Sequence, residues 1–92
     1  MAQSNPEFQP GAMLHEVIVG AFRARGTTFE GWCHENGLTP TNGRNATFGQ
    51  SRGATGQRNL ERIIAAAGIE FVRDAYRRRV AEHFAQIKKG AA

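Results

Sequence analysis

The sequence predicts an all-α fold, a bundle of about five helices. Three observations predict it: apolar residues recur at helical spacing, glycines stand where these stretches end, and a Thr-Pro pair restarts the chain after one such glycine. Ninety-two residues are enough for one small domain. We expect a flexible arm over residues 1–11, a domain over 12–89 and a tail over 90–92.

The first helix is expected from about Ala12 to Arg25, and Gly26 is its stop. One side of it carries an apolar stripe that faces the core: Leu14, Val17, Ile18, Ala21 and Phe22. The polar arm before it contains Glu7 and neither Arg nor Lys. This composition argues against an arm that binds a DNA minor groove.

A second, short helix is expected over residues 28–35. Thr27 and Glu30 have the spacing of a capping box, and Asn36-Gly37 ends the helix, after which Leu38 folds back. Its buried side is formed by Phe29, Trp32 and Cys33. We expect Trp32 to be the core anchor of this helix.

A third helix is expected from Pro40 to about Phe48. Thr39 can cap it and Pro40 suits its first position, so two helices only about three residues apart cross steeply, as in a helix-turn-helix. This segment is rich in residues that disfavour a helix, namely Asn42, Gly43, Asn45, Thr47 and Gly49. Short polar side chains suit close approach to bases and phosphates, and the alternative is a plain loop.

Residues 50–56 are expected to form a flexible connection. A fourth helix follows over 57–67 with Gly68 as its stop, and its inward residues are Leu60, Ile63, Ile64 and Ala67. The last helix is expected over 69–89, with a stripe formed by Val72, Tyr76, Val80, Phe84 and Ile87. This stripe is either core or a subunit seam, and we expect Val72 and Tyr76 in the core, leaving Phe84 and Ile87 for a partner protein.

The charge distribution favours a polyanionic partner. The net charge is +4, and residues 36–60 contain no acidic residue but include Arg44, Arg52 and Arg58. The alternative is that these arginines only solvate a surface. Because the basic stretch coincides with the third helix, we expect double-stranded DNA as the partner.

Several classes of function find no support in the sequence. Cys33 is the single cysteine, so no intramolecular disulfide is possible, and His34 beside it has no further ligands nearby for a metal. No Ser/His/Asp grouping, paired carboxylates or phosphate-cradling glycine loop can be assembled, so we expect neither catalysis nor a cofactor. The N-terminus lacks a signal-peptide pattern and apolar runs stay below the ~18 residues of a membrane span, which predicts a cytoplasmic protein. With DNA as its expected partner, it would be located at the nucleoid.

The run RGTTFEGWCHENGL followed by TPTNGRNA resembles the Ner-type, λ-repressor-like regulators of transposing phages. In that family the corresponding segment also begins Arg-Gly-Thr and turns on Asn-Gly-Leu. The resemblance covers about Leu14 to Gly68 and implies a helical fold whose third helix enters the major groove. More loosely, the chain is similar to the DNA-binding parts of alphaproteobacterial activators of gene transfer agents. It departs from the Ner pattern at Gly43, where the family usually has an apolar residue.

The resemblance implies that Gly43, Ala46 and Thr47 face inward. The residues left to face the bases are Thr41, Asn42, Arg44 and Asn45, and Arg44 is the leading base reader, since Arg can bond guanine through two acceptors. Phosphate contacts are expected from Thr39, Ser51, Arg52 and Arg58. Phe48 is either the last core residue or an exposed contact, and we expect it in the core.

These observations predict a sequence-specific DNA-binding transcriptional regulator, an activator of phage-like genes, present as a monomer or weak dimer. It would recruit RNA polymerase or a partner regulator. The alternative is an adaptor whose helix-turn-helix binds another protein, such as an RNA polymerase subunit, a co-activator or a toxin. The candidate partner surface lies on the last helix and includes Arg73, Arg77, Arg78, Arg79, Phe84 and Ile87.

Overall fold

The computed structural model describes residues 7–51 and 53–91, with side chains as far as Lys88. The described residues form five helices and no strand: α1 (Ala12–Ala24), α2 (Phe29–Glu35), α3 (Pro40–Phe48), α4 (Ala54–Ala67) and α5 (Ile69–Ala91). The predicted all-α class and the order of the helices are confirmed. None of these helices is both long and apolar enough to cross a bilayer.

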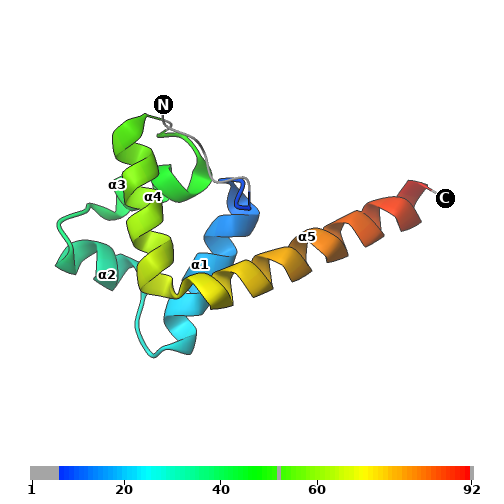
Figure 1. The fold of residues 1–92 in the computed structure, drawn as a ribbon, viewed down its shortest axis with the longest axis horizontal. Helices are drawn as coiled ribbons and strands as arrows, with labels where there is room; N and C mark the ends of the chain where they lie inside the picture. Colours follow the sequence, from blue (N-terminus) through cyan, green and yellow to red (C-terminus); the bar gives the residue numbers. More distant parts are fainter. Residues whose placement is uncertain (1–6, 52, 92) are drawn as a thin grey trace.

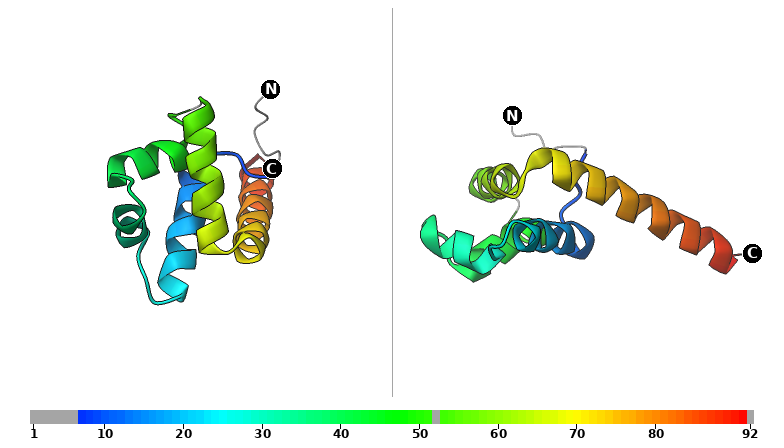
Figure 2. Two further views of the ribbon diagram at one scale, coloured as in Figure 1. Left: turned by 60° about the vertical axis from the view of Figure 1, so that its left-hand side comes forward. Right: turned by 90° about the horizontal axis from the view of Figure 1, so that it is seen from below.

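Helix α1 is the centre of the arrangement, since it packs against each of the other four helices (Figure 1). Helices α2 and α3 lie together on one side of it, and α4 packs on both α1 and α3. Helix α5 begins beside α4 and then runs away from the other helices, as Figure 1 and the right-hand view of Figure 2 show. Its 23 residues therefore start in the bundle and end outside it.

The core combines the apolar stripes of α1, α4 and α5. Its fully buried side chains include Leu14 and Ile18 of α1, Ile63 of α4 and Val72 of α5. Leu60, expected to point inward with Ile63, Ile64 and Ala67, is only half-buried. The helical spacing of the sequence thus identified most of the residues that α4 buries.

Residues 7–10 are attached to the bundle, with Phe8 in the core, so the expectation of a loose arm as far as residue 11 was wrong for this part. Phe8 is 2% exposed, and its ring centroid lies 5.8 Å from that of Tyr76 on α5. The backbone N–H of Gln9 donates to the Tyr76 hydroxyl at 3.1 Å, and Glu7 accepts from Nε of Arg73 at 2.6 Å. This segment ties the start of the chain to α5. Residues 1–6 of the expected arm lie outside the described residues.

Two helices begin differently from the predictions. Helix α2 is capped by Thr28, whose hydroxyl accepts from the Gly31 N–H, while the Thr27 hydroxyl donates to the carbonyl of Phe22. The predicted Thr27–Glu30 capping box is therefore absent. Helix α4 starts at Ala54, three residues early, because its first turn packs against residue 51 at Gly56, where a Cβ would lie only 2.0 Å from the Ser51 carbonyl oxygen.

Two aromatic residues lie nearer the surface than expected. Trp32 is half-buried, and Phe29 and Cys33 anchor α2 in the core instead. Phe48 is 37% exposed, so its expected place in the core was wrong. Its ring packs on His15 of α1, with ring centroids 4.4 Å apart.

Helix α5 divides into two halves. Val72 and Tyr76 are buried, as predicted, and Val80 is half-buried. Phe84 and Ile87 are 65% and 53% exposed. The helix continues to Ala91, two residues beyond its predicted end.

Candidate nucleic-acid interface

Helix α3 has the bounds that its capping residues predict. The Thr39 hydroxyl accepts from the Asn42 N–H at 3.0 Å, Pro40 occupies the first turn, and Gly49 ends the helix in the left-handed region at a φ of 81°. Leu38 returns toward α2, with its N–H donating to the Cys33 carbonyl at 2.8 Å. The plain-loop alternative for this segment is wrong.

The inward side of α3 consists of Gly43, Ala46 and Thr47, as the resemblance implied. At Gly43 the helix approaches α2 so closely that a Cβ would lie 2.6 Å from Sγ of Cys33 and 3.1 Å from Cζ of Phe29. A larger residue would push α3 away from α2. The departure from the Ner pattern therefore has a structural reason, since here the apolar bulk comes from α2.

Thr47 and His15 connect α3 to α1. The fully buried Thr47 hydroxyl donates to the Arg44 carbonyl at 3.1 Å and lies 2.8 Å from Nδ1 of His15. The pKa of His15 is lowered, mainly because burial disfavours the charged ring and also because Arg44 is close. Sequence reasoning gave His15 no role, because its hydrogen-bond partner Thr47 lies 32 residues later in the chain. The only available signal was that Thr47 was expected to face inward.

The outward side of α3 is short and polar. Thr41, Asn42 and Arg44 are exposed, and Asn45 is half-buried. The guanidinium of Arg44 lies 3.5 Å from the carboxylate of Glu30 on α2, with both side chains well exposed to water. A surface ion pair of this kind contributes little, so Arg44 can exchange it for another acceptor. Glu30, expected as a cap, is instead the acidic neighbour of Arg44.

Helix α4 places two arginines beside this surface. Arg58 and Arg62 are exposed and lie four residues apart, on the same side of α4. Nη2 of Arg62 donates to the carbonyl of Asn36 in the α2–α3 turn, and its guanidinium lies 5.7 Å from the centre of the Trp32 ring. Neither arginine forms an ion pair with any carboxylate in the described part of the chain. Arg62 was missed, although its spacing from Arg58 could have indicated it.

The other predicted phosphate contacts are divided. Thr39 is exposed at the start of α3, whereas Ser51 is half-buried at the edge of a pocket. Arg52 lies outside the described residues. Thr39, Thr41, Asn42 and Arg44 are thus the exposed residues of this surface, and Arg62 of α4 reaches the turn that precedes α3. Ser51 lies at the pocket instead.

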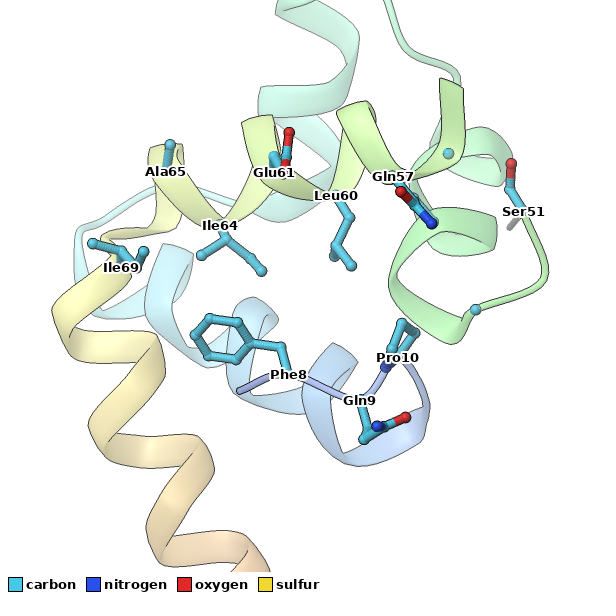
Figure 3. Close-up of a pocket in the computed structure, with 13 residues that line it drawn as sticks. Phe8, Gln9, Pro10, Ser51, Gln57, Leu60, Glu61, Ile64, Ala65 and Ile69 are labelled. Atoms are coloured by element: carbon cyan, nitrogen blue, oxygen red, sulfur yellow. The ribbon is translucent and has the colours of Figure 1, made fainter. Parts of the chain in front are cut away.

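The pocket, of about 610 Å³, separates residues 8–10 from α4 (Figure 3). Its sides are mostly apolar, with Phe8 facing Leu60 and Ile64, and Gln57 and Glu61 near its edge.

Within the described residues no group of three or more His, Cys, Asp or Glu side chains could hold a metal. Burial also raises the pKa of the Cys33 thiol, which keeps it protonated and uncharged.

The arginines of α5 contrast with those near α3. Arg73 and Arg77 both approach Glu7, Arg78 pairs with Asp74 one turn earlier, and Arg79 reaches Glu16 of α1 at 2.8 Å. These four residues therefore do not form the single basic face that was expected. Only Arg73 and Arg77 share a side of the helix, and Arg73 is partly enclosed by Glu7 and Glu70.

No family model, curated protein or solved structure matches this chain.

Proposed function

We propose that this protein is a sequence-specific DNA-binding transcriptional regulator that inserts α3 into the major groove. One observation carries the proposal. Helix α3 buries its small residues against α1, α2 and α4 and turns Thr41, Asn42 and Arg44 to the solvent. A helix held in this way can approach base edges without losing its packing, and Arg and Asn are the side chains that read guanine and adenine.

The charges around α3 support the same function. Arg58 and Arg62 stand beside it without a described carboxylate partner, and the α2–α3 turn contains no acidic residue. Arginines placed next to a recognition helix bind phosphates, which sets affinity and register. With the resemblance to phage regulators, this supports an activator of phage-like genes that acts at the nucleoid without catalysis.

The test begins with genome-wide immunoprecipitation of the tagged protein, which returns the bound motif. On that motif, Arg44→Ala should weaken binding by about 1 to 3 kcal/mol and relax the preference at one base pair. Arg58→Ala should weaken binding to the motif and to random DNA alike. Equal losses on both DNAs for Arg44→Ala would refute its role as base reader.

Two further variants control for charge. Arg78→Ala removes the same charge from α5, far from α3, and should leave binding to the motif nearly unchanged. Glu30→Gln removes the carboxylate beside Arg44 and should tighten DNA binding slightly. The logarithm of affinity should also fall with the logarithm of salt, by about 0.9 for each phosphate neutralised.

A second candidate function, an adaptor that binds another protein, is favoured by the exposed Phe84 and Ile87 on α5. A mobility-shift assay with random competitor DNA separates the two. The adaptor predicts no sequence preference, whereas the regulator predicts a complex that survives competitor. Both functions can also coexist, because a small regulator must recruit polymerase through some surface.

A further inference from the structure

The outer half of α5 carries an apolar stripe that nothing in the described chain covers. Val80, Phe84 and Ile87 follow one another at spacings of four and three, so they lie on one side of the helix. Val80 is half-buried at the edge of the bundle, and Phe84 and Ile87 are 65% and 53% exposed. We call Val80, Phe84 and Ile87 the outer stripe. It continues the row that is buried as Val72 and Tyr76 nearer the start of the helix.

The charges beside the outer stripe are positive. Arg77 lies two turns before Phe84 and Lys88 one turn after it, and both are exposed on the same side. The acids of this region point elsewhere, because Asp74 pairs with Arg78 and Glu82 lies two residues before Phe84, almost opposite it. Arg77 is also 3.5 Å from Glu7, but Glu7 is held more closely by Arg73 at 2.6 Å.

From this arrangement we propose that the outer stripe binds an amphipathic helix of another protein whose apolar side is bordered by Asp and Glu. The apolar side chains would fill the space beside Phe84 and Ile87, and the carboxylates would meet Arg77 and Lys88. This is recognition of one amphipathic helix by another, as in a helical zipper, in which apolar anchors give affinity and bordering charges select the partner.

A second copy of this chain is the poorer occupant. Residues 77–88 contain four basic residues and one acidic residue. Two such helices would bring like charges together whether they ran parallel or antiparallel, and fewer than three heptads are free outside the bundle. An acidic partner removes this repulsion and gains from the same charges.

The test uses the full chain and two labelled synthetic helical peptides, followed by fluorescence anisotropy. Both peptides have Leu along one side; one has Glu and the other Lys on both borders. The Glu peptide should bind with saturation, more weakly as salt is added, and the Lys peptide should not bind. Phe84→Ala and Arg77→Glu should each weaken binding of the Glu peptide by about tenfold.

Matched controls lie on the opposite side of α5. Phe71→Ala removes an exposed Phe (52% exposed), and Arg78→Glu reverses an exposed arginine, so neither should change peptide binding. Thermal melts of Phe84→Ala and Arg77→Glu check that they are folded, and each should bind the DNA motif as the unmodified chain does. Failure of DNA binding in the unmodified chain would count against the proposed function and not against this surface.

Three results would overturn the proposal. One is no binding of the Glu peptide, or equal binding of both peptides. Another is a dimer in sedimentation equilibrium that Phe84→Ala dissolves, which would identify a second copy as the occupant. The third is loss of DNA binding in Arg77→Glu with unchanged peptide binding, which would assign these cations to phosphates.

Discussion

Helices α3 and the outer half of α5 are ordered for opposite reasons. Helix α3 is rich in Asn, Thr and Gly, which are poor helix formers, yet it is enclosed by three other helices and capped at both ends. The outer half of α5 contains Ala, Glu, Gln and Lys, which favour helix, and its residues 81–88 are exposed. One helix depends on tertiary contacts and the other on local preference.

The difference matters for function. The surface on α3 has a fixed orientation, because small residues pack on its inner side and the Thr47 hydroxyl lies 2.8 Å from Nδ1 of His15 on α1. The outer half of α5 has no such packing, because its residues 81–88 are exposed. Substitutions that remove apolar side chains should therefore lower the free energy of unfolding strongly in the bundle and hardly at all in the outer half of α5.

The largest effect is expected from Phe8→Ala. Phe8 is 2% exposed and covers Tyr76, so its loss should lower the free energy of unfolding by about 3 to 5 kcal/mol. Phe84→Ala removes the same ring from the outer half of α5 and should change it by less than about 0.5 kcal/mol. Urea unfolding followed by circular dichroism measures both. Similar losses in the two variants would contradict the division of α5 into packed and free halves.

An intermediate effect is expected from Gly43→Ala. Alanine is the better helix former, but its Cβ would meet Cys33 and Phe29, so the variant should lose about 1 to 3 kcal/mol. Gly20→Ala is the matched control, because Gly20 lies exposed on α1 with nothing within 4 Å of an added Cβ. It should gain up to about 1 kcal/mol. A gain in both variants would show that α3 does not need close contact with α2.

The smallest effect is expected from pH. The pKa of His15 in the folded protein is below its ordinary value of 6.5. As the pH falls, the imidazole is therefore protonated in the unfolded chain before it is protonated in the folded protein. The stability due to neutral His15 is complete above pH 6.5 and is lost as the pH falls through the lower folded pKa. Glu7, whose pKa lies below its ordinary 4.5, adds a separate loss below pH 4.5.

Unfolding curves between pH 4.5 and 8 should therefore show a decline that His15→Gln lacks. Glu7→Gln is the complementary control. In curves that are extended below pH 4.5, it should keep the decline below pH 6.5 and lose the one below pH 4.5. A His15→Gln variant with the same pH dependence as the unmodified chain would exclude His15 as its source.

Sequence alone determined the order of the helices and which residues of α3 face inward. Thr39, Pro40 and Gly49 set the bounds of α3 through contacts within one turn, and Gly26, Gly37 and Gly68 stop their helices by accepting positive φ. The spacing of Val72, Tyr76 and Phe84 marks one side of α5 without reference to any neighbour. Signals of this kind are local, so a single sequence contains them.

Only the tertiary structure decided which neighbours these surfaces meet. Phe8 stands alone among polar residues and prolines, so no periodicity could place it against Tyr76, sixty-eight residues later. From the sequence, Gly43 only weakens α3, whereas in the structure it allows the close contact with Cys33. Likewise, the sequence suggests Glu30 as a helix cap, whereas the structure places it beside Arg44. Each of these three contacts joins segments that are separate in the sequence. A pattern within one segment contains no information about its distance from another segment.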